Sequence, residues 1–150
     1  MNAARFAPPP AATVEADVAA ALAEDIGPGD ATASLLEDRA DIAYLLCKED
    51  CVLAGQPWFE ACHRALDPAV DIDWRFGEGD RIAKGTVVAT LRGRSRALVT
   101  AERASLNFLQ TLSGTATITA RHVDAVRGTG TTLLDTRKTI PGLRIAQKYA

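Results

Sequence analysis

The chain has 150 residues, of which 47% are hydrophobic and 24% are charged, as in an ordinary soluble globular domain. Its formal net charge of -2 excludes a general attraction for polyanions, so an anion site has to be built locally from clustered basic side chains. No basic run alternates with aromatic residues, which excludes nucleic acid as a partner. Charged residues interrupt every apolar window well short of the length of a membrane span, which excludes a membrane.

The first part of the chain predicts an arm followed by a helix. The opening residues lack the continuous apolar core of a signal peptide, so we expect a cytoplasmic protein. Residues 1–12 contain three consecutive prolines and little else, which predicts a disordered arm. A helix is expected from Thr13, its N-cap, to about Asp25, where a GPGD turn ends it. Its apolar residues at helical spacing are Val14, Val18, Ala21 and Leu22.

The next part predicts a small sheet with helices. Residues 41–55 predict two strands around a charged turn at 48–50, and Pro57 suits the first turn of a following helix. Apolar and polar residues alternate over 70–76, which predicts a half-buried strand. A strand pair is expected around Gly85, and a further strand at about 95–99. These elements favour an α+β layer structure.

Three cysteines raise the question of a metal site. They are Cys47, Cys51 and Cys62, and Cys62 precedes His63. The paired short spacings of a structural zinc site are absent, so we predict no metal ligands here. An odd number of cysteines in a cytoplasmic chain favours reduced thiols, buried in a strand and a helix.

The last third predicts a helix, a glycine turn, a buried strand and the start of another helix. The first helix is expected over 100–127 with an interruption at Ser113-Gly114, and the apolar strand over 131–134. Pro141 is expected in the first turn of the last helix. This order is typical of a parallel β/α unit, and because one unit cannot cover both faces of its strand, we expect the chain to end inside a domain.

The sequence DTRKTIPGLR places basic residues directly after the predicted strand, where active sites of parallel sheets lie. The Arg137 fork matches a carboxylate, the Lys138 ammonium suits a phosphate or a second carboxylate, and Thr136 supplies a hydroxyl. From Thr136 onward no acidic residue balances these charges. A pocket for a small anionic substrate and a solvated surface both fit the pattern. Arg144 and Lys148 share a helical face that can equally well face water.

A second candidate site lies on the predicted helix over 100–127. Arg103, Asn107 and Gln110 form a stripe that contains no acidic residue, which suits a partner subunit or an anionic ligand, although a solvated face also explains it. Glu102 is expected in the first turn, where the helix dipole favours it. The apolar face consists of Ala101, Ala104, Phe108 and Leu112.

Other chemical motifs are missing from the sequence. We expect His63 and His122 to be ordinary helix residues, since neither lies beside a plausible nucleophile in the sequence. The glycine turns at 27–30 and 128–130 match neither the P-loop nor the dinucleotide fingerprint.

The segments ERASLNFLQTLSGTAT and DTRKTIPGLRIAQKYA resemble the quinolinate phosphoribosyltransferase family, also called nicotinate-nucleotide pyrophosphorylase (carboxylating). LAEDIGPGDAT and GEGDRIAKGTVVATLRG resemble the N-terminal domain of the same family, so the resemblance covers nearly the whole chain. Ile140 departs from the family pattern, in which we expect Thr.

The resemblance implies a fold in three parts. Residues 1–12 would be the disordered arm, residues 13–112 an α+β sandwich-like domain (an open sheet with helices, hammerhead-like), and residues 113–150 the first β/α unit of an incomplete (β/α) barrel. The later barrel strands of the family carry an Asn-His-Arg segment, a Lys and acidic residues near the metal. None of these is present in the chain, so we expect no independent activity from residues 1–150.

The resemblance also implies a reaction in NAD biosynthesis. Quinolinate and phosphoribosyl pyrophosphate would give nicotinate mononucleotide, pyrophosphate and CO₂, with Mg²⁺ assisting. Arg137 and Lys138 would be catalytic and line the pocket, Arg137 clamping a quinolinate carboxylate and Lys138 lying near the phosphoribosyl group. Thr136 would belong to the same binding stretch. Arg103 would bind substrate in the neighbouring subunit of a homodimer or higher homo-oligomer.

Two alternatives remain open at the level of sequence. One is a related type II phosphoribosyltransferase, either nicotinate-acting or associated with molybdate transport. The other is a biotinyl- or lipoyl-like carrier module, because GEGDRIAKGTVVATLRG has its glycine-punctuated strand rhythm. Against the carrier, the segment lacks a Lys at an exposed hairpin tip between suitable flanking residues, Lys84 being the residue that an adduct would modify.

Overall fold

The computed structural model describes residue 7 and residues 9–150, so most of the arm predicted for residues 1–12 lies outside the described part. The elements are α1 (Ala11–Ile26), α2 (Ala31–Ser34), β1 (Ala40–Leu46), β2 (Cys51–Val52), α3 (Gln56–Leu66), β3 (Asp71–Trp74), β4 (Arg81–Ile82), β5 (Val87–Arg94), α4 (Ser95–Val126) and α5 (Arg144–Tyr149). No helix within 9–150 has both the length and the hydropathy that crossing a membrane requires.

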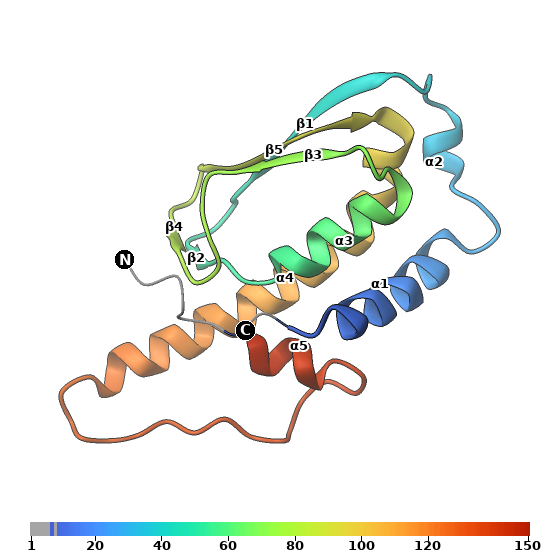
Figure 1. Cartoon of the computed structure of the whole chain (residues 1–150). Coiled ribbons are helices and arrows are strands. Elements are labelled where there is room, and N and C mark those ends of the chain that lie inside the picture. The colour runs from blue at the N-terminus through green and yellow to red at the C-terminus, as the bar shows by residue number, and fades with distance from the viewer. Residues whose placement is uncertain (1–6, 8) are drawn as a thin grey trace.

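The predicted α+β open sheet is confirmed. Strand β5 lies between β1 and β3 in an antiparallel sheet, and β2 pairs with β4 in a second, smaller sheet. One prediction about pairing is wrong. The strands on either side of Gly85 do not pair with each other, because β4 pairs with β2 and β5 pairs with β1 and β3. Figure 1 shows the larger sheet as one layer, with α3 and α4 along one face and α1 beyond them.

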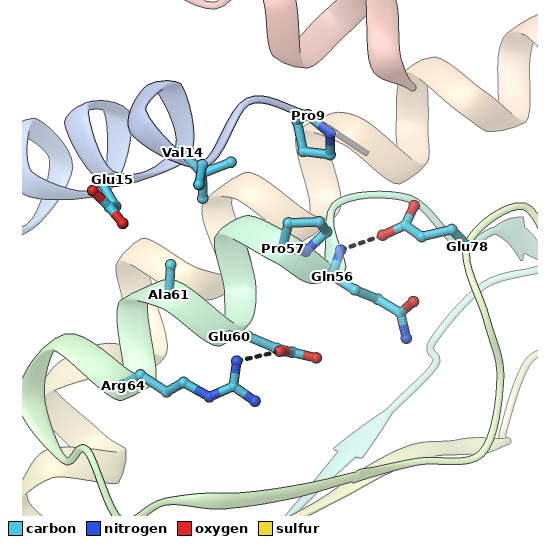
Figure 2. A pocket seen from close by; sticks show the side chains of 10 residues that line it. Pro9, Val14, Glu15, Gln56, Pro57, Glu60, Ala61, Arg64 and Glu78 are labelled. Atoms are coloured by element: carbon cyan, nitrogen blue, oxygen red, sulfur yellow. Dashed lines mark hydrogen bonds and ion pairs between the residues drawn. The ribbon is translucent and has the colours of Figure 1, made fainter. Parts of the chain in front are cut away.

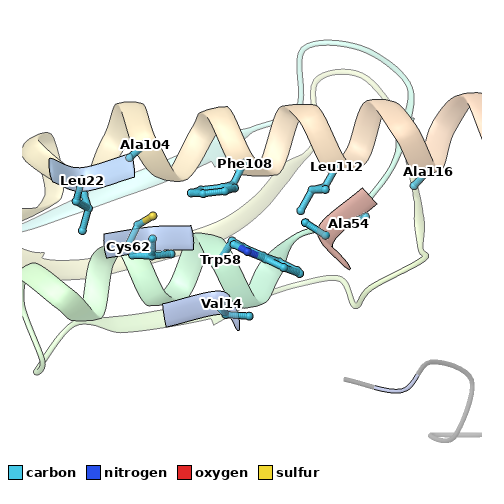
Figure 3. Packing of buried hydrophobic residues seen from close by; sticks show 11 residues of the cluster. Val14, Leu22, Ala54, Trp58, Cys62, Ala104, Phe108, Leu112 and Ala116 are labelled. Carbon is cyan, nitrogen blue, oxygen red and sulfur yellow. The ribbon is translucent and has the colours of Figure 1, made fainter. Parts of the chain in front are cut away.

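Two groups of buried side chains hold these layers together. Between the sheet and the helices, Ala89 and Leu91 of β5 contact a cluster that includes Phe59 and Leu109. On the other side of α3, the Trp58 and Leu112 side chains are 0% exposed between α1, α3 and α4 (Figure 3). The predicted apolar face of the 100–127 helix, consisting of Ala101, Ala104, Phe108 and Leu112, is buried as expected.

Helix α4 is longer than the sequence pattern predicts. It begins at Ser95, so the strand predicted over 95–99 is wrong, and Glu102 lies about two turns inside the helix instead of in its first turn. The Ser95 N–H donates to the Arg39 carbonyl (2.8 Å), and the Arg39 N–H donates to Ser95 Oγ (3.2 Å). These bonds fix the start of α4 at the end of β5, and packing of Leu98 on the core favours the helix over a strand.

The interruption predicted at Ser113-Gly114 is also wrong, because α4 continues through it. Ser113 Oγ accepts from the Ala54 N–H and donates to the Ala54 carbonyl, each at 3.1 Å. The hydroxyl thus satisfies both backbone groups of Ala54 without disturbing the helix. The domain boundary predicted after residue 112 lies inside this unbroken helix.

At the N-terminal end, α1 begins three residues earlier than predicted. Pro10, not Thr13, precedes the first turn, and its carbonyl accepts from the Thr13 N–H (3.0 Å) and the Val14 N–H (3.2 Å). The end of α1 near Asp25 is confirmed, since the helix ends at Ile26 and Gly27 adopts a positive φ of 49°. Ala11 and Ala12, predicted as part of the arm, are helical.

The connection from α4 to α5 contains no strand. The strand predicted over 131–134 is wrong for the described chain, where Leu134 is 83% exposed. A strand needs a neighbouring strand to accept and donate its backbone hydrogen bonds, and none lies beside this segment within residues 9–150. Pro141 also lies outside the last helix, in a turn where the Leu143 N–H donates to the Ile140 carbonyl (3.0 Å).

Gly55 allows α3 and α4 to approach each other. Its φ is +107°, and a Cβ atom there would lie 3.0 Å from Leu112 Cδ1. Gly114 provides a matched contrast, because it lies in α4 with open space around its Cα. We therefore expect Gly55→Ala to lower the free energy of unfolding by ~2–4 kcal/mol through backbone strain and overpacking.

The control Gly114→Ala is expected to raise the free energy of unfolding by ~0.5–1 kcal/mol, because Ala is the better helix former. Urea unfolding followed by circular dichroism measures both changes. Equal effects of the two substitutions would contradict the close approach at Gly55.

His63 is an ordinary helix residue, as predicted, but it is deeply buried, with 4% of its surface exposed. The Ser105 hydroxyl donates to the Glu102 carbonyl (3.0 Å), so His63 Nε2, 3.2 Å from Ser105 Oγ, is the donor to that oxygen. His63 Nδ1 then keeps its lone pair and has no partner within the described residues. Burial lowers the pKa of His63 to about 4, so the ring is neutral at pH 7.

Acid is therefore expected to destabilise the fold partly through His63. His63 takes up a proton near pH 6.5 in the unfolded chain but only near pH 4 in the folded chain. The stability that the folded state gains from neutral His63 is therefore lost as the pH falls from 6.5 to 4. Within that window the loss approaches ~1.4 kcal/mol per pH unit. Unfolding curves from pH 7 to pH 4 should show a shallower decline for His63→Gln than for the exposed control His122→Gln. Parallel declines would contradict this assignment.

Candidate functional site

The basic segment after residue 134 is held as a short turn. The Lys138 N–H donates to Thr136 Oγ1 (3.1 Å), so the threonine side chain fixes the backbone on either side of Arg137. Thr136, Arg137 and Lys138 are all exposed. Within residues 9–150, neither Arg137 nor Lys138 forms an ion pair. Two adjacent cations thus remain available for an anion.

Asp135 supplies one acid that balances a cation of the last helix. Its carboxylate forms an ion pair with Lys148. Arg144, one turn earlier, points its Nε toward Thr139 Oγ1 at 3.5 Å. Lys148 is therefore paired with an acid inside the segment 135–150, and the Arg144 side chain lies against Thr139 of the same segment. Arg137 and Lys138 are the two basic residues of 135–150 that remain without such a contact.

Helix α5 fastens this segment to the rest of the molecule. Ala146 is 0% exposed, and the Tyr149 ring lies 5.7 Å from the Trp58 ring, measured between centroids. Next to Ala146 in the same helix, Gln147 Oε1 accepts from the Ile140 N–H of the preceding turn (2.6 Å). These contacts tie the turn at 136–138 to the core between α1, α3 and α4.

Glu78 is an organising residue that the sequence analysis missed. It lies in the GEGD turn, yet its carboxylate accepts from the Gly55 N–H (2.9 Å) and the Gln56 N–H (2.5 Å) at the start of α3. Burial raises the pKa of Glu78 despite these bonds. Burial, and then the neighbouring Glu78 carboxylate, raise the pKa of Tyr149 to about 12. An acid inside a glycine turn was the only signal in the sequence.

The predicted stripe on α4 is exposed, as expected, at Arg103, Asn107 and Gln110. The stripe itself contains no acidic residue, but α1 supplies an acidic partner from a distant part of the sequence. Arg103 Nη1 lies 2.8 Å from Asp25 Oδ1, and the bond to Asp25 keeps the pKa of Arg103 above its ordinary value. Asp30 lies nearby, where its carboxylate caps α2 and accepts from the Thr100 hydroxyl (2.7 Å).

The two candidate groups do not meet within the described chain. Arg103 bonds to α1, whereas residues 136–138 lie in the long connection that leaves the other end of α4 and returns through α5 (Figure 1). Within residues 9–150, no cluster of three or more His, Cys, Asp or Glu side chains is suited to a metal ion. Arg103 and the turn at 136–138 are therefore two separate basic sites of one chain.

A groove elsewhere on the surface has the wrong charge for an anionic substrate. Its volume is about 430 Å³, and it opens between the starts of α1 and α3 (Figure 2). Three carboxylates line it, those of Glu15, Glu60 and Glu78, against the single cation of Arg64. Arg64 is already paired with Glu60 at 2.6 Å. The basic turn at 136–138 is the better candidate for binding an anion.

Lys84 does not occupy a carrier-type hairpin. It lies in the exposed turn between β4 and β5, where its backbone N–H donates to Asp50 Oδ1 (2.8 Å). Because β4 and β5 pair with other strands, this turn does not join two partners of one hairpin. The arrangement disfavours a biotinyl- or lipoyl-like module.

Family comparisons cover almost the whole described chain. Residues 30–113 match the N-terminal domain model of quinolinate phosphoribosyl transferase, and residues 115–150 match the model of its C-terminal domain. A probable nicotinate-nucleotide pyrophosphorylase (carboxylating) from Synechocystis is 43% identical over 86% of the chain and 44% of that protein. Quinolinate phosphoribosyltransferase (decarboxylating) 1b from Nicotiana tabacum is 40% identical over 87% of the chain and 37% of its own length.

Solved structures give the same relationship. The nicotinate-nucleotide pyrophosphorylase of Francisella tularensis superposes with a TM-score of 0.92 at 40% identity, over 99% of the chain and 54% of that protein. NadC of Streptococcus pyogenes gives a TM-score of 0.90 at 35% identity, over 95% and 52%. The chain spans less than half the length of the two curated relatives and about half of these solved chains.

Proposed function

Because the chain belongs to the quinolinate phosphoribosyltransferase family, we propose that it forms part of an enzyme that joins quinolinate to a phosphoribosyl group. The products would be nicotinate mononucleotide, pyrophosphate and CO₂, in the biosynthesis of NAD. The observation that carries this proposal is the turn at 136–138, where Arg137 and Lys138 are exposed and have no acidic partner among residues 9–150. Such a turn suits substrates that carry carboxylates and phosphates.

The roles of the two cations follow from their shapes. Quinolinate is a pyridine diacid, and the planar Arg137 fork can donate two parallel hydrogen bonds to one carboxylate. The Lys138 ammonium is a compact charge that suits the phosphoribosyl group. Thr136 keeps the two side chains on one turn. Holding both anionic substrates beside fixed cations lowers their mutual repulsion and the entropic barrier to reaction.

In the proposed reaction, charge develops on both the ribose carbon and the leaving pyrophosphate. Pyrophosphate leaves as the ribose carbon gains positive charge, and the pyridine nitrogen attacks that carbon. A fixed cation beside the departing phosphates, the role assigned to Lys138, stabilises the transition state without reorganisation. The pyridinium product then makes loss of the adjacent carboxylate easier. Since no group of three His, Cys, Asp or Glu side chains within residues 9–150 is suited to a metal ion, Mg²⁺ would arrive with the phosphates, and we assign none of these residues to it.

The remainder of the active centre belongs to a (β/α) barrel in this proposal. The match of residues 115–150 to the C-terminal domain supports it. Residues 131–134 would then form a strand once neighbouring barrel strands supply backbone partners, which would also cover the exposed Leu134. Such a strand would place residues 136–138 at its carboxyl end, the functional end of a parallel barrel.

We also assign Arg103 to the active site of a neighbouring subunit in a homodimer or higher oligomer. Its side chain is 71% exposed and lies in a polar stripe with Asn107 and Gln110. Release of the ion pair with Asp25 requires little free energy, since solvent screens a pair whose arginine is exposed. The Arg103 side chain is thus free to exchange Asp25 for a substrate anion.

Removing the Arg137 guanidinium is expected to weaken quinolinate binding. In the protein extended to the family's full length, Arg137→Ala should raise the Kd by about 10- to 100-fold, because charge-assisted hydrogen bonds contribute ~1.5–3 kcal/mol. Isothermal titration calorimetry measures the change. Arg121→Ala is the matched control, an exposed arginine of α4 whose loss should leave the Kd unchanged. Equal affinities for the Arg137 variant and the unsubstituted protein would refute the assignment.

Mixed dimers test whether Arg103 acts across subunits. Arg103→Ala and Arg137→Ala chains should each be inactive as homodimers, yet co-expression should restore about a quarter of the activity, since half of the dimers are mixed and each holds one intact site. If Arg103 acts within its own chain, the mixture stays inactive. Activity per dimer of tagged, purified heterodimers measures the outcome directly.

A further inference from the structure

Two thiols lie side by side outside the proposed catalytic site. Cys47 directly follows β1 and Cys51 begins β2, and their Sγ atoms are 3.5 Å apart. Both side chains are half-buried, in contrast with Cys62, which is 0% exposed inside α3. The sequence pattern predicts that all three cysteines are buried thiols. The positions of Cys47 and Cys51 differ from that expectation, because they combine proximity with access to solvent.

The backbone on both sides of the pair is fixed to the same neighbouring segment. The Cys47 N–H donates to the Thr86 carbonyl (2.9 Å), and the Cys47 carbonyl accepts from the Gly85 N–H (2.7 Å). Cys51 is paired with Ile82 in the small sheet. Asp50, in the turn between the cysteines, accepts from the Lys84 N–H (2.8 Å). Residues 82–86 therefore hold both thiols in place, so little chain entropy opposes their joining.

We propose that Cys47 and Cys51 are a redox modification site, at which they form a reversible disulfide by exchange with a low-molecular-weight disulfide. An S–S bond is ~2.05 Å long, so the sulfur atoms, now 3.5 Å apart, have to approach by about 1.5 Å. Within residues 9–150, no third His, Cys, Asp or Glu side chain joins the two thiols in a group suited to a metal ion, so the pair does not make a metal site.

The exchange is balanced in two steps. The Cys47 thiolate attacks one sulfur of the reagent disulfide, whose S–S bond breaks and releases one thiol. Cys51 then attacks the Cys47 sulfur of the mixed disulfide, and the second reagent thiol leaves. The protein loses two electrons and two protons, and the two reagent thiols receive them. Burial, and then contact with Cys47, raise the pKa of Cys51 to about 11, which places Cys51 in the intramolecular step, where proximity compensates for a low thiolate population.

The disulfide would join two parts of the fold. Cys47 follows the edge strand of the larger sheet, whereas Cys51 belongs to β2 of the smaller sheet. Beside Cys51, the Val52 N–H donates to Thr117 Oγ1 of α4 (2.9 Å). The bond would therefore restrict movement of the larger sheet relative to the α4 helix. It depends on neither Arg137 nor Arg103 and is independent of the proposed function.

Oxidised glutathione is the probe for this site. The folded protein is incubated with it, the remaining thiols are alkylated, and the intact mass is measured. We expect the loss of two hydrogen atoms without a bound glutathione. Because trypsin cleaves after Lys48, between the two cysteines, the disulfide should hold two tryptic peptides together until dithiothreitol separates them. The oxidised protein should also have a higher Tm, and reduction should reverse the shift.

Single substitutions provide the controls. Cys47→Ser and Cys51→Ser should each prevent the peptide linkage, and Cys51→Ser should instead retain one glutathione on Cys47. Cys62→Ala should still form the linkage, and circular dichroism confirms that each variant is folded. The proposal is overturned if the folded wild-type protein accumulates stable glutathione adducts, links Cys62, or stays reduced while the urea-unfolded chain oxidises.

Discussion

Packing of α4 against α3 and the sheet is the constraint on which the other elements depend. Helix α4 has 32 residues, about 48 Å of continuous helix. Small residues on its buried face, such as Ala101, Ala104 and Ser105, allow α3 to lie close, and Gly55 removes the side chain that would collide with Leu112. The same helix begins where β5 ends and leads to the connection that carries Arg137. The packing of α4 therefore builds the core and also fixes the point from which the connection to Arg137 starts.

The distribution of charge explains how a chain with a net charge of -2 can present an anion site. Several cations are engaged by acids brought from distant parts of the sequence, as in the pairs of Arg103 with Asp25 and of Arg94 with Asp38. Arg137 and Lys138 lack such partners within residues 9–150 and lie on a turn fixed by Thr136. The acidic groove beside α3 lies elsewhere, between the starts of α1 and α3, where Glu78 organises the N-terminus of α3. Local pairing, not total charge, sets the potential at each surface.

Local sequence patterns predicted the helices and strands whose apolar residues recur at a regular spacing and so form one buried face. The strand around Ile72, the helix around Cys62 and the apolar face of α4 are examples. The segment 95–99 failed because a short apolar run fits a strand and a buried helix equally well, and packing of Leu98 decides between them. The partner of Arg103 was hidden because Asp25 lies 78 residues away in the sequence. The strand expected over 131–134 requires a neighbouring strand for its backbone hydrogen bonds. The local pattern of these residues gives no information on whether such a neighbour is present.

The central claim is that the free cations of the 136–138 turn bind the pyridine diacid, with Arg103 supplied by a second subunit. A crystal structure of the family-length protein with bound quinolinate tests it most directly. The account predicts a quinolinate carboxylate within ~3 Å of the Arg137 guanidinium, at hydrogen-bond distance, and Arg103 of the adjacent subunit turned from Asp25 toward the ligand. Quinolinate bound in the groove between α1 and α3, with Arg137 still in solvent, would contradict the account.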